Sequence, residues 1–180
     1  MKLPYLLLIF VTSLFVACNS GDKKETSLDT SKMALQAFSD SVKLDTFRID
    51  LEGKKANEML LLFTITAHNG KQIYRKEIKA DELLKGYLAS AELKKEEEKI
   101  KFLNDEINYF FEEQHFLIPA VTLEEQPDKN VPDTAFYNEL KQNQLNGFDY
   151  RLGKDTKVYI AWSVKEKKVK IYYQCCKLPE

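Results

Sequence analysis

An Asn-Gly pair between two alternating segments is the feature that most constrains the fold of this 180-residue chain. Asn69-Gly70 lies within residues 58–78, and both residues tolerate the positive φ angles of a tight hairpin turn. A two-residue turn would pair His68 with Lys71. The register that follows places apolar residues on one face, namely Met59 and the pairs Leu61/Ile78, Phe63/Lys76 and Ile65/Tyr74. We expect that face to lie on the core.

Residues 156–176 alternate in the same way and predict a second hairpin with its turn at Glu166-Lys167. One face joins apolar residues in the pairs Val164/Val169, Trp162/Ile171, Ile160/Tyr173 and Val158/Cys175. The opposite face carries Tyr159, Tyr172 and Cys176. Core packing explains most of the aromatic residues, so these three side chains are the candidates for a surface that contacts a ligand or a partner.

The middle of the chain predicts helices. Residues 81–115 are helical in pattern, with Asp81 as N-cap and a break near Gly86, because glycine costs about 1 kcal/mol in a helix interior. A longer helix is expected over about 90–115. A shorter one, from Pro132 to about residue 145, would end at Asn146-Gly147.

Two further strands complete the predicted order. Residues 43–51 predict a strand with core contacts from Leu44, Phe47, Ile49 and Leu51, and residues 117–124 predict a short edge strand because Pro119 interrupts it. The class is therefore α+β. We expect an antiparallel sheet built from hairpins (58–78 and 156–176), with the long helix (about 90–115) and the shorter helix (about 132–145) packed on one face.

Composition supports one packed domain and argues against nucleic-acid binding. The 44% hydrophobic content, with 11 Phe and 9 Tyr, is ample for one core. The formal net charge of −1 offers no electrostatic basis for nucleic-acid binding.

The N-terminus predicts export. The apolar run 3–16 is shorter than the roughly 20 residues that span a bilayer, and it fits the hydrophobic part of a signal peptide. It ends in Leu14-Phe15-Val16-Ala17-Cys18. That ending resembles the lipobox of bacterial lipoproteins, although Phe15 stands where the family usually has an aliphatic residue. The domain beyond it resembles only small, uncharacterised envelope lipoproteins.

The resemblance implies a cellular location for the protein. Residues 1–17 would be removed as a lipoprotein signal peptide, and Cys18 would carry the acyl chains, including palmitate, that anchor the protein to the lipid bilayer. Asn19 stands where Asp favours inner-membrane retention in this family. The implied location is therefore the cell envelope, with the outer membrane, at its periplasmic or surface face, favoured over the inner membrane.

A tether is expected between the anchor and the domain. Residues 18–37 hold the lipidated cysteine and a polar segment that cannot bury enough apolar surface to order itself. As a flexible chain it would reach roughly 25 Å, and an arm packed on the domain is the alternative. Residues 38–180 would then form a single α+β domain.

No residue pattern predicts catalysis, a cofactor or a metal. The sequence has no Gly-x-Ser-x-Gly, phosphate loop or zinc-ligand spacing. Glu112 and His115 have the i, i+3 spacing of one half of a carboxylate-bridged metal site, without a second Glu-x-x-His. The predicted register puts Cys175 in the core and Cys176 in solvent, and a disulfide or a soft-metal pair are the alternatives.

Function is therefore expected to be that of a membrane-anchored envelope lipoprotein with a non-enzymatic binding or interaction module. The partner would be an unidentified protein or small ligand. A structural or assembly component of an envelope complex is one alternative, and an envelope enzyme with an unrecognised site is another. A deep pocket with convergent ionisable groups would favour the enzyme, a flat exposed aromatic patch would favour the binding module, and absence of both would favour an assembly role.

Overall fold

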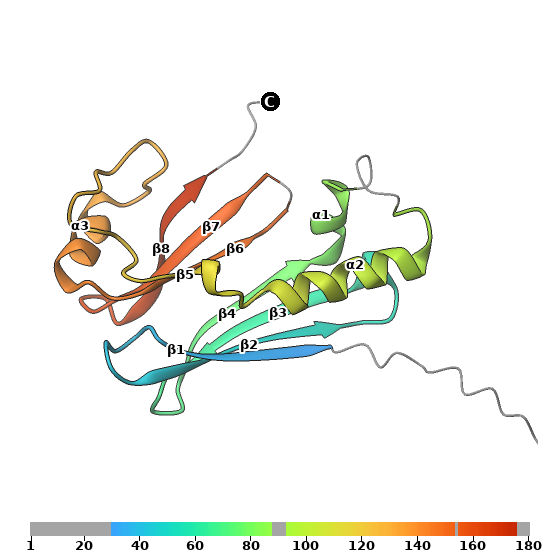
Figure 1. Cartoon of the computed structure of the whole chain (residues 1–180), viewed down its shortest axis with the longest axis horizontal. Helices are drawn as coiled ribbons and strands as arrows, with labels where there is room; N and C mark the ends of the chain where they lie inside the picture. The colour runs from blue at the N-terminus through green and yellow to red at the C-terminus, as the bar shows by residue number, and fades with distance from the viewer. Residues whose placement is uncertain (1–29, 88–92, 154, 176–180) are drawn as a thin grey trace, which may run out of the picture.

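The computed structural model describes residues 30–87, 93–153 and 155–175. Within them, two antiparallel sheets of four strands each combine with helices, which confirms the predicted α+β class (Figure 1). The two predicted hairpins lie in different sheets. The signal peptide, Cys18 and Asn19 lie outside the described residues. None of the helices in the described ranges is long and apolar enough to span a membrane.

Sheet A is a meander of four strands in chain order. They are β1 (Ser31–Ala37), β2 (Leu44–Glu52), β3 (Leu60–Thr66) and β4 (Gln72–Lys79). Strand β1 corrects the predicted tether, because residues 31–37 pair with β2 along their whole length. Main-chain hydrogen bonds order this edge strand, and they do not depend on the apolar content from which the tether was predicted.

The first hairpin, β3–β4, has the predicted register except at its turn. The pairs Leu61/Ile78, Phe63/Lys76 and Ile65/Tyr74 are confirmed, and Leu61, Phe63, Ile65 and Met59 are buried as expected. At the turn, Ala67 rather than His68 faces Lys71, donating its N–H to the Lys71 carbonyl at 2.8 Å. A bulge after Ile65 and a positive φ of 84° at Gly70 accommodate the longer loop.

Strand β2 follows its predicted pattern with one exception. Phe47, Ile49 and Leu51 are buried, but Leu44 is 52% exposed. Leu44 is the first residue of the strand and lies three positions before Phe47. Successive side chains of a strand point to opposite faces, so Leu44 points away from the core.

The helical region is interrupted at Gly86, as the sequence predicted. Helix α1 (Ala80–Lys85) ends at Gly86, and helix α2 (Glu96–Tyr109) buries Leu103 and Ile107. Helix α2 is shorter than expected at both ends. The Glu98 carboxylate fixes its start by accepting hydrogen bonds from the N–H groups of residues 94 and 95. Its end gives way to the 3₁₀ turn Glu113–His115. Asp81 lies in the first turn of α1 rather than at its N-cap.

Sheet B has the order β5-β6-β7-β8. Its strands are β5 (Phe116–Leu117), β6 (Gly147–Arg151), β7 (Lys157–Ser163) and β8 (Lys168–Cys175). Strand β5 covers only the beginning of the strand predicted over 117–124.

The shorter helix is present as α3 (Thr134–Asn143). It is capped by Asp133, whose carboxylate accepts the N–H of Phe136 at 3.0 Å. It stops at Gln144, which has a positive φ of 53°, and not at Asn146-Gly147. Gly147 instead begins strand β6.

The register of the second hairpin, β7–β8, differs from the prediction. A four-residue turn over 164–167, with Lys167 at a φ of 52°, replaces the predicted two-residue turn and pairs Trp162 with Val169. A bulge between Tyr159 and Ile160 then pairs Tyr159 with Tyr173 and Lys157 with Cys175. The bulge moves Tyr173 from its predicted core position onto the face that carries Tyr159.

The predicted core position of Cys175 is wrong in this register, whereas the alternative of a disulfide holds for Cys175. Cys175 is half-buried rather than in the core, and it is disulfide-bonded. The other two cysteines of the chain, Cys18 and Cys176, lie outside the described residues.

The main core lies between the two sheets. Phe148 of β6 contacts Phe47 and Phe63 of sheet A, with both ring-centroid distances at 5.3 Å, and helix α2 closes this core. On its other face sheet B packs Ala161 and Tyr172 against Phe136 and Leu140 of α3. Sheet B is therefore covered on both faces.

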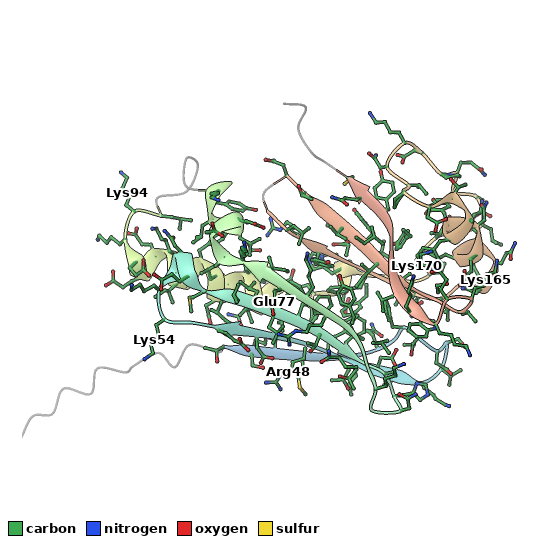
Figure 2. The ribbon with its side chains drawn as sticks, turned by 180° about the vertical axis from the view of Figure 1, so that it is seen from behind. Arg48, Lys54, Glu77, Lys94, Lys165 and Lys170 are labelled. Atoms are coloured by element: carbon green, nitrogen blue, oxygen red, sulfur yellow. The ribbon has the colours of Figure 1, made fainter. Side chains whose placement is uncertain are left out.

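The outer face of sheet A is turned to solvent. Met33 and Leu35 of β1 are each 59% exposed, beside ion pairs that join Arg48 to Asp50 and Arg75 to Glu77. Figure 2 views the molecule from this side, with Arg48 and Glu77 labelled on the sheet.

Candidate functional site

Two pockets carry the chemistry of this fold, and they differ in character. The charged pocket lies where α2 meets sheet A and strand β6, and its volume is about 40 Å³. Its polar and aromatic lining comes from Glu106, Tyr109, Phe110, His115, Asp149, Tyr150 and Arg151. That volume holds about two or three water molecules.

Asp149 is the centre of the charged pocket. Asp149 is 2% exposed. Its carboxylate lies 2.7 Å from Nδ1 of His115 and 2.9 Å from Nζ of Lys157. A buried carboxylate is costly unless it is paired and hydrogen-bonded. Strand β6 supplies the acid, its partner β7 the lysine, and the turn before β5 the histidine. The cluster therefore ties three segments of sheet B together.

A second ion pair joins sheet B to helix α2. The Arg151 guanidinium donates to both carboxylate oxygens of Glu106, at 2.7 and 2.9 Å, and also donates to the hydroxyl of Tyr87. Burial raises the pKa of Glu106, and the neighbouring guanidinium of Arg151 opposes that rise. One guanidinium nitrogen of Arg151 makes both contacts with Glu106, and the other donates to Tyr87.

Two tyrosine hydroxyls bridge the sheets beside this pocket. The hydroxyls of Tyr74 in β4 and Tyr150 in β6 are 2.6 Å apart. Burial raises the pKa of both phenols. The carboxylates of Asp149 and Glu106 and the Tyr150 hydroxyl thus have protein partners, and among the described residues the lining of the charged pocket includes no serine, threonine, cysteine or lysine.

The tyrosine pocket lies between sheet B and the segment 117–128, and its volume is about 320 Å³. Pockets that bind small molecules are roughly 300–1,000 Å³. Four of its ten lining residues are tyrosines, and its two charged lining residues are both acidic: the lining comprises Leu117, Pro119, Ala120, Glu125, Gln126, Asp128, Tyr137, Tyr159, Tyr172 and Tyr173.

The four tyrosine rings stand at steep angles to one another. Tyr159 is perpendicular to Tyr173, at 90° with a centroid distance of 5.2 Å, and at 71° to Tyr172 at 6.1 Å. Tyr137 of α3 meets Tyr172 at 51° and 6.5 Å. Such edge-to-face contacts are favourable aromatic geometries, and they leave differently oriented rings as the walls of one pocket.

Three of the hydroxyls are directed at the protein itself. Tyr172 donates to the carbonyl of Ala120 at 3.0 Å, and Tyr173 donates to Asp128 at 3.2 Å. Tyr137 donates to Glu125 at 3.4 Å. Burial, with the adjacent Glu125 carboxylate, raises the pKa of Tyr137 to about 12. Burial also raises the pKa of Tyr159 and of Tyr172, so all three phenols stay neutral at ordinary pH.

The structure brings two of the three predicted surface residues together. Tyr159 and Tyr172 share the tyrosine pocket, but Tyr172 is only 2% exposed and forms its rear wall rather than an exposed surface. Cys176 lies outside the described residues. The charged side chains of the pocket, Glu125 and Asp128, and two of its rings, Tyr137 and Tyr173, were not predicted.

The histidines take structural positions. His115 faces Asp149 rather than the metal half-site suggested by Glu112. His68 lies 3.6 Å from the buried carboxylate of Asp45, whose oxygens also accept backbone N–H groups. In the described part of the chain, no three His, Cys, Asp or Glu side chains gather as a metal site.

Comparison with known proteins adds no family to this description. A scan with protein-family models and searches of curated proteins and of solved structures give no significant match to the chain.

Proposed function

We propose that this chain is an envelope lipoprotein, anchored to a bilayer through acylated Cys18, whose domain is a non-enzymatic binding module with the tyrosine pocket as its site. One observation carries the binding role: an open pocket of about 320 Å³ with four tyrosines in its lining. Tyrosine rings provide large rigid contact surfaces at low conformational-entropy cost.

The charged pocket supports this assignment by contrast. It satisfies the criterion of convergent ionisable groups, but its carboxylates are committed to His115, Lys157 and Arg151. Its volume of about 40 Å³ admits water rather than a substrate. Charges that are paired within the chain hold its segments together. The charged pocket therefore lacks the volume that a substrate of the enzyme alternative would need.

The binding role is tested by ligand content. We would purify the full chain and its Tyr159→Leu variant from membranes and compare the extracted small molecules by mass spectrometry. Tyr109→Leu is the matched control, because Tyr109 is an exposed tyrosine outside the tyrosine pocket. A compound retained by wild type and control but lost from Tyr159→Leu supports the proposal. Identical extracts from all three proteins, or none with a bound compound, would reject it.

The anchor is tested separately with labelled palmitate. We expect wild type to incorporate the label and Cys18→Ala to lose it. Acylation consumes the Cys18 thiol, so peptide mapping without reductant adds an independent check on the disulfide of Cys175. A peptide in which Cys175 is joined to Cys18, or a wild type that takes up no label, would refute the lipid anchor.

A further inference from the structure

From the arrangement of the tyrosine pocket we infer that it binds an organic cation with an alkylated ammonium group, such as the trimethylammonium of choline. This inference rests on the proposed binding function and names the chemistry of its ligand. Two features select such a group: aromatic ring faces and uncompensated negative charge at one site. An alkylated ammonium combines a positive charge with an apolar surface, and clusters of aromatic rings recognise it by cation–π attraction.

The charges that line the pocket are both negative. Glu125 and Asp128 are exposed, so they stand at the solvent side of the ring cluster. The Asp128 carboxylate accepts the N–H of Asn130 at 2.8 Å and the Tyr173 hydroxyl at 3.2 Å. These neutral donors fix its position and leave its charge uncancelled.

Among the described residues, no lysine forms an ion pair with either carboxylate. Lys157 is paired with the buried Asp149 at 2.9 Å. Lys141 donates to the backbone carbonyl of Glu125 at 2.6 Å, outside the lining of the pocket. The Lys157 ammonium lies 5.5 Å from the centroid of the Tyr159 ring, so Tyr159 already makes a cation–π contact within the chain.

Hydrogen bonding within the pocket disfavours other ligand classes. The hydroxyls of Tyr137 and Tyr173 donate to the two carboxylates, so they offer no proton to an anionic ligand. An anion would also face Glu125 and Asp128. A small hydrated metal ion would gain little from ring faces, whereas a methylated ammonium loses little hydration and contacts the rings directly.

The test is a titration of the full chain in a non-ionic detergent with choline and with 3,3-dimethylbutan-1-ol, its neutral carbon analogue of the same shape. Calorimetry or saturation-transfer NMR would report the affinities. We expect the neutral analogue to bind at least about tenfold more weakly than choline. Glycerophosphocholine, the soluble lipid head group, distinguishes the two sources: if it binds as well as choline, a lipid head group fits, and if only choline binds, the ligand is a free alkylated ammonium compound.

Variants separate the ring and charge contributions. Tyr159→Leu should weaken choline binding about 3- to 30-fold, the range that one cation–π contact provides. The double variant Glu125→Gln, Asp128→Asn keeps the hydrogen-bond acceptors and should weaken choline without affecting the neutral analogue. Glu124→Gln is the matched control, because it removes the charge of the adjacent residue, which does not line the pocket, and it should bind choline as wild type does.

The outcomes distinguish the two proposals. If choline and its neutral analogue bind equally and Tyr159→Leu weakens both, the pocket is a binding site but the ammonium inference is wrong. If choline does not bind while wild type still retains a Tyr159-dependent compound from membranes, the inference again fails and the binding function stands. Circular dichroism of each variant excludes loss of fold as the cause of lost binding.

Discussion

The charged pocket and the tyrosine pocket are both built on sheet B, yet they use their polar groups in opposite ways. In the charged pocket the carboxylates of Asp149 and Glu106 are neutralised by cations of the same chain. In the tyrosine pocket, Glu125 and Asp128 accept hydrogen bonds from neutral groups and remain exposed. A concentration of paired charge therefore marks the part of this molecule that holds it together, whereas the tyrosine pocket presents two exposed carboxylates that form no ion pair among the described residues.

The largest effect should come from the charged pocket. Asp149→Ala leaves the Lys157 ammonium and the His115 imidazole without their buried partner, and we expect it to lower the free energy of unfolding by about 3 kcal/mol. Urea denaturation measures the loss. Glu77→Ala, which breaks an exposed pair with Arg75, should cost no more than about 0.5 kcal/mol. Equal losses in the two variants would show that Asp149 is not a structural centre.

The rear of the tyrosine pocket should be nearly as sensitive. At Gly147 a Cβ atom would lie 2.9 Å from the Tyr172 hydroxyl oxygen and 3.2 Å from the backbone Cα of Ala120. Gly147→Ala should therefore destabilise the fold by about 2 kcal/mol through overpacking, as measured by thermal or urea unfolding. Gly153→Ala is the control, because its nearest neighbour would be at 3.5 Å. A neutral Gly147→Ala would mean that the 117–120 segment moves freely away from the sheet.

Parts of this fold could be predicted from the sequence and other parts could not. The alternation of Leu61, Phe63 and Ile65 defined a core face, because side-chain period and burial coincide in a strand. The β1 strand could not be predicted, since its order comes from pairing with β2 rather than from its own composition. Gly147 was expected to end a helix, and only the three-dimensional contact with Ala120 and Tyr172 explains why glycine is required there.

The tyrosine pocket itself was only partly predictable. Tyr159 and Tyr172 share a face in a simple alternating register, and they meet as expected. Tyr173 joins them because a bulge after Tyr159 shifts β8 by one residue, and no local residue pattern marks that bulge. Tyr137, Glu125 and Asp128 come from α3 and the preceding loop, so their approach depends on tertiary packing. The sequence signal that could indicate this pocket is the presence of several tyrosines in one hairpin together with acidic residues in a nearby loop.

Tyr172→Phe should have a moderate effect on stability and almost none on binding. It removes the hydrogen bond to the Ala120 carbonyl and should cost about 1 kcal/mol, whereas its ring remains as the rear wall. Choline affinity should change less than about twofold, because a ring face rather than a hydroxyl makes the contact. Tyr109→Phe, at an exposed tyrosine, is the control for stability. Loss of choline binding in Tyr172→Phe would show that a hydroxyl, not a ring face, recognises the ligand.

The smallest effect concerns Tyr137 of the tyrosine pocket and appears only at alkaline pH. Burial and Glu125 raise the pKa of Tyr137 from 10.0 to about 12. The unfolded chain therefore releases this proton at lower pH than the folded chain does. The contribution of Tyr137 to stability is complete below pH 10 and is lost as pH rises toward about 12. The difference in unfolding free energy between wild type and Tyr137→Phe should decrease across that window.

Glu125→Gln tests the cause of this shift. Without the carboxylate the pKa of Tyr137 should fall, but it should stay above 10.0 because burial is the larger cause. Phenolate absorbance, taken as the difference between proteins with and without Tyr137, follows that pKa alone, and Glu124→Gln should leave it unchanged. If Glu125→Gln leaves the pKa of Tyr137 unchanged, the Glu125 carboxylate exerts no field on the ring, and the same carboxylate would then have no means of attracting a cation to the pocket. This pH measurement therefore tests the electrostatic difference between the two pockets without requiring any ligand.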